Sequence, residues 1–111
     1  MLLLMISFSD HTSYARRIRL QSIVSASEIF RRQNRYDEAI KILDKAEVNN
    51  LNGYWRIAVL GAYGETLASH PQGKKAEAAG KLKEALAVKG ITDAQKVAYE
   101  KRLAELQAED K

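Results

Sequence analysis

The scarcity of helix-breaking residues constrains this chain more than any other feature. Its 111 residues include a single proline, Pro71, and six glycines, which leaves long stretches in which a helix can continue without interruption. Hydrophobic residues make up 46% of the chain and charged residues 29%, which suits one modest hydrophobic core and argues against disorder. Because cysteine is absent, a disulfide scaffold, a thiol nucleophile and a thiolate zinc site are excluded.

Apolar residues recur at steps of three and four along most of the chain, which predicts five helices and no strand. The predicted helices cover residues 13–33, 36–48, 54–69, 74–89 and 92–108, with fraying beyond. In the third helix apolar residues occupy most of the circumference, which is typical of a central helix packed on more than one side. Gly61 and Gly64 within it favour close packing of a neighbour. The fold class is therefore all-α.

Several helix ends carry recognisable signals. Gly90 is expected to cap the fourth helix in the left-handed conformation. Thr92 and Gln95 have the spacing of a capping box that begins the fifth helix. In the second helix, Asp37 and Lys41 are spaced for a favourable ion pair. The glycine and the capping box indicate where the chain turns between the fourth and fifth helices.

We expect one domain with four consecutive parts. An apolar N-terminal tail covers residues 1–12, a first helical hairpin covers 13–48, a second hairpin covers 51–90, and a C-terminal capping helix covers 91–111. The second and fourth helices form an internal repeat, since their apolar residues superimpose. The alignment places small, large and small residues in the same order: Ala39 with Ala78, Leu43 with Leu82, and Ala46 with Ala85.

The stretch from Asn34 to Ala46 resembles the second helix of a tetratricopeptide repeat, with Tyr36 opening the helix before Asp-Glu-Ala. Upstream, Ile23, Ala26, Ser27 and Phe30 occupy the positions that this family fills with apolar, small and aromatic residues. In the second unit, Leu60-Gly61 matches the family's Leu-Gly pair, and a longer loop at His70-Pro71 extends the repeat beyond the family's length of about 34 residues. The resemblance covers about residues 20–88 and implies antiparallel hairpins stacked as a short solenoid.

The resemblance also implies a groove, lined mainly by the first helix of each pair, that receives a peptide or a partner helix. The residues it places in that groove are Gln21, Val24, Ser25, Glu28, Arg31 and Arg32 of the first unit and Asn52, Arg56 and Glu65 of the second. Family members that clamp a chaperone's terminal carboxylate use lysine and asparagine there, and Val24 and Glu28 depart from that pattern. We therefore expect a protein-binding adaptor without that particular activity.

No active site, metal site or cofactor site is predicted. Asp10, His11 and Ser13 are the residue types of a hydrolase triad, but neighbours in a flexible tail cannot hold its geometry. Glu38, Asp44 and Glu47 fall in one predicted helix and lack a second set of ligands. His70, next to Pro71, is read as an ordinary loop residue. The chain is expected not to be an enzyme.

The charge distribution leaves a second interpretation open. The net charge is only +4, but the segment 14–36 holds one acid, Glu28, and six arginines: Arg16, Arg17, Arg19, Arg31, Arg32 and Arg35. Such a segment could bind nucleic acid. Exposed aromatic residues are not interleaved with these arginines, so protein binding is the favoured interpretation.

The first eight residues, Met1 to Phe8, are almost entirely apolar. They lack the basic start and cleavage site of a secretory signal and are too short to span a bilayer, so a cytoplasmic location is expected. Two hairpins and a cap leave open edges on the stack, since arrays of this kind usually need three repeats. Either residues 1–8 fold over such an edge or a second copy covers it, and self-association is the favoured outcome.

Overall fold

The computed structural model describes the backbone of residues 2–109 and the side chains of residues 14–108. Its elements, in chain order, are α1 (Leu2–Arg32), α2 (Tyr36–Asp44), the short 3₁₀ helix η1 (Val48–Asn50), α3 (Gly53–Ser69), α4 (Lys75–Leu86) and α5 (Asp93–Glu109). No strand occurs within the described residues. The predicted all-α class with five α-helices is confirmed.

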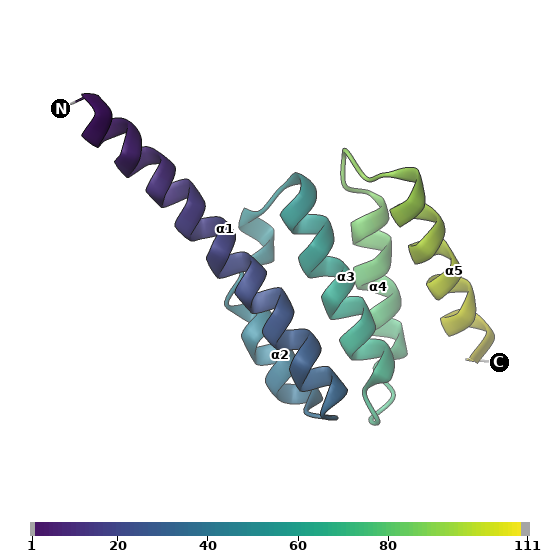
Figure 1. Ribbon diagram of the computed structural model, residues 1–111. Coiled ribbons are helices and arrows are strands. Elements are labelled where there is room, and N and C mark those ends of the chain that lie inside the picture. Colours follow the sequence, from purple (N-terminus) through teal and green to yellow (C-terminus); the bar gives the residue numbers. More distant parts are fainter. Residues whose placement is uncertain (1, 110–111) are drawn as a thin grey trace.

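Consecutive helices run in opposite directions, and α1, α3 and α5 descend through the view of Figure 1 while α2 and α4 ascend. Helix α3 contacts α1, α2 and α4, and α4 contacts α5. The N-terminal half of α1 leads away from the other helices, which gives the molecule extents of 63 × 30 × 20 Å. The predicted central position of the third helix is confirmed.

The hydrophobic core follows the residues of the internal repeat. Ala39, Leu43, Ala78, Leu82 and Ala85 are fully buried. Leu43, Ala78 and Leu82 belong to one cluster with apolar residues of α3 and with Leu20 of α1. The small residues let α2 and α4 approach their neighbours, and each leucine fills the space between them. The six aligned positions therefore lie in the core, as the alignment of the two helices predicts.

Two glycines of α3 allow neighbouring helices to come close. A Cβ atom on Gly64 would lie 2.7 Å from Cδ2 of Leu82, and one on Gly61 would lie 2.5 Å from the hydroxyl oxygen of Tyr99. Real Cβ contacts are longer than this, so any larger residue would displace Leu82 or Tyr99. The predicted role of both glycines in close packing is confirmed.

The predicted start of the first helix is wrong. It was placed at Ser13, after a tail of residues 1–12, whereas α1 begins at Leu2. Ser13 is a residue type that favours a helix N-cap, but neither glycine nor proline occurs between Met1 and Ser13 to interrupt a helix. The backbone therefore continues through the proposed boundary as one helix of 31 residues.

Two helices end earlier than predicted. Helix α2 ends at Asp44 rather than Val48, because Glu47 adopts a left-handed conformation with φ of 52°. Helix α4 ends at Leu86 rather than Lys89. The chain tightens just after Leu86, and the N–H of Val88 donates to the carbonyl of Ala85 at 3.2 Å. Both ends are set by the connecting loops.

The signals around α5 are mostly confirmed. Gly90 has φ of 98°, the predicted left-handed region, but it shapes the loop before α5 because α4 has already ended. The capping box is present: the N–H of Thr92 donates to Oε1 of Gln95 at 3.0 Å, and the N–H of Gln95 donates to Oγ1 of Thr92 at 3.1 Å. Within the described residues, no helix is long and apolar enough to cross a bilayer.

Candidate binding groove

An open groove of about 210 Å³ lies between α1, α3 and α5. It is lined by Val24, Ser27, Glu28 and Arg31 of α1, by Ala58, Gly61, Ala62 and Glu65 of α3, and by Tyr99 of α5. On both α1 and α3 the lining residues follow steps of three and four, so each helix presents one continuous face. The floor is formed by the small residues Ala58, Gly61 and Ala62. Their size creates the hollow.

Tyr99 closes the groove on the α5 side. Its ring reaches across to Gly61, where the glycine leaves room for the hydroxyl. Burial raises the pKa of Tyr99, and the negative charge of Glu65 raises it further, so the side chain stays a neutral phenol. No hydrogen bond joins this hydroxyl to any other residue that the structure describes. It remains available to a ligand as donor and acceptor.

The charges around the groove are unequally compensated. Glu28 accepts a hydrogen bond from Arg32 at 2.5 Å, and Glu65 lies 3.3 Å from the guanidinium of Arg102. Arg31 makes neither a hydrogen bond nor an ion pair with a described residue. The two carboxylates are therefore neutralised by neighbours, while the guanidinium of Arg31 is left free to hold an acidic group.

The structure brings together part of the predicted site. Val24, Glu28 and Arg31 share the groove with Glu65, as expected for the first helices of two pairs. Arg32 is exposed beside the groove and is engaged by Glu28. These residues belong to one surface.

Gln21, Ser25, Asn52 and Arg56, which were also expected at the binding site, are not among the residues that line this groove. Gln21 lies on a separate face with Trp55, and its Nε2 donates to Oγ of Ser25 at 3.1 Å. Gln21 and Ser25 lie one helical turn apart on α1, and their hydrogen bond runs along the helix surface. Sequence spacing alone did not separate the two faces.

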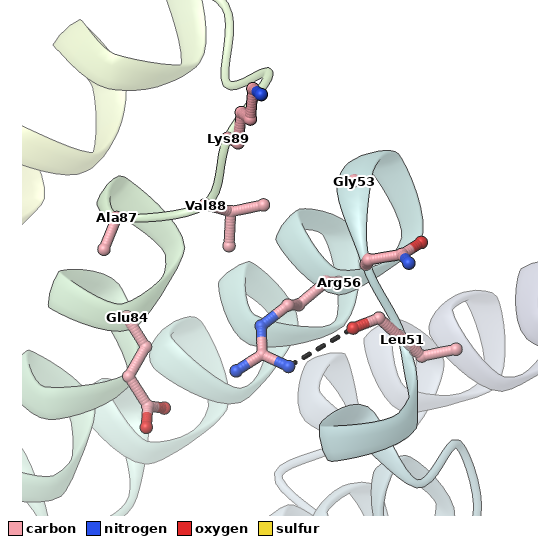
Figure 2. A pocket seen from close by; sticks show the side chains of 8 residues that line it. Leu51, Gly53, Arg56, Glu84, Ala87, Val88 and Lys89 are labelled. Carbon is pink, nitrogen blue, oxygen red and sulfur yellow. Dashed lines mark hydrogen bonds between the residues drawn. The ribbon is translucent and has the colours of Figure 1, made fainter.

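Asn52 and Arg56 line a larger pocket of about 640 Å³, between the start of α3 and the end of α4. Figure 2 shows the Arg56 side chain in this pocket, with Glu84 on the opposite wall. Nη1 of Arg56 donates to the carbonyl oxygens of Val48 and Leu51, both at 3.2 Å. Arg56 therefore holds the loop that enters α3, which is a structural role that the sequence did not indicate.

Ala58, Ala62 and Tyr99 line the groove without having been predicted as site residues. The two alanines could have been found, because they lie on the same helical face as Gly61 and Glu65. Tyr99 could not, because its contact with Gly61 spans two loops and a helix. The periodicity of α5 shows which side is apolar but not which helix it meets.

The acidic residues of the predicted second helix are engaged separately. Glu38 accepts hydrogen bonds from the guanidinium of Arg35, and Oε2 of Glu47 accepts one from Asn50 at 3.1 Å. Oδ1 of Asp44 accepts the Tyr63 hydroxyl at 2.5 Å, and burial together with this contact raises the pKa of Tyr63. No three His, Asp or Glu side chains within the described residues are grouped to hold a metal ion.

The triad residue types Asp10, His11 and Ser13 have side chains outside the described residues. Across the described side chains, the groove offers a shaped apolar floor, one free cation and one free hydroxyl. Those features suit recognition of an extended or helical segment. No protein-family model, curated protein or solved structure matches the chain.

Proposed function

We propose that this chain is a non-catalytic protein-interaction domain of tetratricopeptide type that acts as an adaptor in the cytoplasm. Its antiparallel pairs α1–α2 and α3–α4 stack as a short solenoid, with α5 as the capping helix. A peptide or a partner helix occupies the groove between α1, α3 and α5. Three features support this: the buried internal repeat of α2 and α4, the order of helix contacts, and the position of the groove on the first helix of each pair.

The observation that carries the proposal is the free guanidinium of Arg31 above an apolar floor. A ligand segment can place a small apolar side chain against Ala58 and Ala62 while an acidic group reaches Arg31. Charge-assisted hydrogen bonds of this kind are about twice as strong as neutral ones. The Tyr99 hydroxyl lies on the same groove and adds a second polar contact.

The test is selection of peptides from a random display library on the immobilised full chain, followed by affinity measurement in solution. Arg31→Glu should weaken the selected peptides about tenfold or more, since it replaces an attraction by a repulsion. Ala58→Arg, which fills the groove floor, should weaken them as well. Lys83→Glu is the matched control, because Lys83 is an exposed lysine of α4 that does not line the groove.

Peptides that bind both groove variants as tightly as the wild type would contradict the proposal. Failure of the library to yield any peptide above background would also count against it. Capture of partners from a cell extract with wild type and Arg31→Glu in parallel then identifies the natural ligand. The relevant proteins are those lost from the variant and kept by Lys83→Glu.

A further inference from the structure

An apolar face is exposed where α1 passes the start of α3. This face, called the Trp55 face below, surrounds an open hollow of about 360 Å³ and consists of Tyr14, Arg17, Ile18, Gln21 and Ser22 of α1 with Trp55 of α3. Tyr14 is 56% exposed and Ile18 is 48% exposed. Large apolar side chains gathered around one hollow mark an interaction surface more than scattered ones do.

Helix α1 is much longer than the helix that packs beside it. It has 31 residues, whereas α2 has nine. All described side chains before Leu20 are exposed, and the backbone of the N-terminal half leads away from the other helices (Figure 1). Helices without tertiary packing are only marginally stable in water, because propagation barely repays the nucleation cost. This half of α1 therefore needs a surface to pack on.

The sequence of that half is itself apolar. Six of the seven residues from Leu2 to Phe8 are leucine, methionine, isoleucine or phenylalanine. Their side chains lie outside the described residues, but their place on the helix is set by the backbone. Met5 and Ile18 are separated by about 20 Å along α1 at 1.5 Å per residue. The apolar run therefore cannot reach the Trp55 face of its own chain while α1 is continuous.

We propose that two copies of the chain associate through antiparallel α1 helices, each packing residues 2–8 against the Trp55 face of the other. The charges agree with this direction. Asp10 is the single acid before Glu28, and Arg16 and Arg17 follow it by less than two turns. An antiparallel pair that crosses near residues 12–13 brings Asp10 of each copy opposite those arginines of the other. A parallel pair would bring like charges together instead.

A two-fold interface repeats every contact, so both apolar runs and both Trp55 faces are covered at once. No residue lines both the Trp55 face and the groove between α1, α3 and α5. Self-association and ligand binding in the groove can therefore be tested separately, and the failure of one leaves the other standing.

The experiment is sedimentation velocity on the full chain over a concentration series from about 1 to 200 µM, a range that spans micromolar affinities. We expect a monomer–dimer equilibrium. Leu4→Glu, within the apolar run of residues 2–8, and Ile18→Glu, within the Trp55 face, are the two test variants. Each should raise the dimer Kd about tenfold or more, because each places a charge in an apolar contact. Val97→Glu is the control, because Val97 is an exposed apolar residue of α5 outside the face.

Mixing the two defective variants gives the sharper result. A mixed pair keeps one unaltered run on one unaltered face, so an equimolar mixture should recover dimer that neither variant forms alone. Circular dichroism confirms that each variant is folded. If residues 2–8 of the two copies contacted only each other, every mixed pair would contain one altered run and no mixed dimer would form. That result would overturn the proposal.

Other outcomes overturn it as well. These are a monomer throughout the series, or a dimer that Ile18→Glu leaves intact. The alternative occupant of an apolar, arginine-flanked helix is a membrane surface. A chain that is monomeric in solution and sediments with phosphatidylcholine–phosphatidylserine vesicles would replace the self-association proposal.

Discussion

His70, at the C-terminal end of α3, lies 2.9 Å through its Nε2 from Oδ1 of Asp37 in the first turn of α2. Nδ1 of the same ring accepts a hydrogen bond from the N–H of Gln72 at 3.1 Å. Because a backbone N–H can only donate, Nδ1 is the acceptor and Nε2 carries the proton given to Asp37. His70 is buried and its ring lies 5.8 Å from that of Tyr36. A loop residue thus links the end of α3 to the start of α2.

This contact makes stability depend on pH through Asp37. The hydrogen bond from His70 lowers the pKa of Asp37 below its usual value, and Lys74 and Lys41 lower it further. The folded state releases this proton at a lower pH than the unfolded state does. The contact therefore stabilises the fold above the unfolded carboxyl pKa of about 4, and the effect is lost as the pH falls through the lower folded value.

Asp37→Asn tests this dependence, because asparagine keeps the oxygen acceptor and cannot ionise. We expect the urea midpoint of the variant to lie below that of the wild type at pH 7. The two midpoints should converge as the pH falls below about 4. Glu100→Gln, at an exposed position of α5, is the control and should run parallel to the wild type. A difference for Asp37→Asn that stays constant down to pH 3 would contradict the assignment.

The leucines of the repeat should dominate the stability of the core. Leu43 and Leu82 are both 0% exposed, so truncation to alanine leaves a cavity in either hairpin. Each of Leu43→Ala and Leu82→Ala should lower the free energy of unfolding by about 2–4 kcal/mol. Val97→Ala, at a position that is 67% exposed, should change it by less than about 0.5 kcal/mol. Urea unfolding measures all three, and equal effects at buried and exposed sites would show that the buried stripes are assigned wrongly.

The repeat could be predicted because burial on a helix follows a period that is visible in the sequence. Ala39, Leu43 and their partners in α4 lie in the core, where the alignment of the two helices placed them. The central position of α3 followed from apolar residues on most of its circumference. In both cases the prediction depended on the periodicity within a helix and not on contacts between helices.

Contacts between distant helices could not be predicted in the same way. Asp37 was expected to pair with Lys41 on its own helix, yet its carboxylate contacts His70, which is 33 residues away. Arg56 was expected in the groove and instead binds carbonyl oxygens of the preceding loop. Periodicity assigns a residue to a face, but the rotation and height of one helix against the next decide what that face meets.

Three helical glycines should respond differently to alanine, which tests the packing of α3 and α4. An added Cβ at Gly80 meets nothing within 4 Å, so Gly80→Ala should raise the free energy of unfolding by about 0.5–1 kcal/mol through helix propensity. Gly64→Ala should lower it by about 1–3 kcal/mol, because the methyl group collides with Cγ and Cδ2 of Leu82. Gly61→Ala should lower it less, since its collision is mainly with the movable end of Tyr99. Thermal unfolding ranks the variants, and a neutral Gly64→Ala would disprove the close approach.

The nucleic-acid interpretation gives a separate prediction, because several arginines of the segment 14–36 are already engaged. Arg32 is paired with Glu28, and Arg35 is paired with Glu38 and stacks over Phe30 at 4.7 Å. These contacts reduce the positive field along α1.

Arg19 is engaged as well, since its guanidinium donates to the carbonyl of Lys45 at 2.6 Å. Arg16, Arg17 and Arg31 remain without a hydrogen bond or ion pair to a described residue. Few arginines of the segment 14–36 are therefore left to bind the phosphate groups of a nucleic acid.

The number of free arginines limits the salt dependence that binding can show. Each neutralised phosphate contributes a slope of about −0.9 to log K against log salt, so three free arginines allow a slope of about −3 at most. We expect random-sequence DNA and RNA to bind more weakly than about 100 µM at physiological salt, the weak end of non-specific binding. Fluorescence anisotropy at two salt concentrations measures both quantities. The comparison variant is the triple substitution Arg16→Ala, Arg17→Ala and Arg19→Ala. It removes two of the three free arginines, so it should bind no more tightly than the wild type and show a slope of about −1 at most. Micromolar binding with a steeper slope that disappears in this variant would make nucleic acid, and not a protein segment, the ligand of α1.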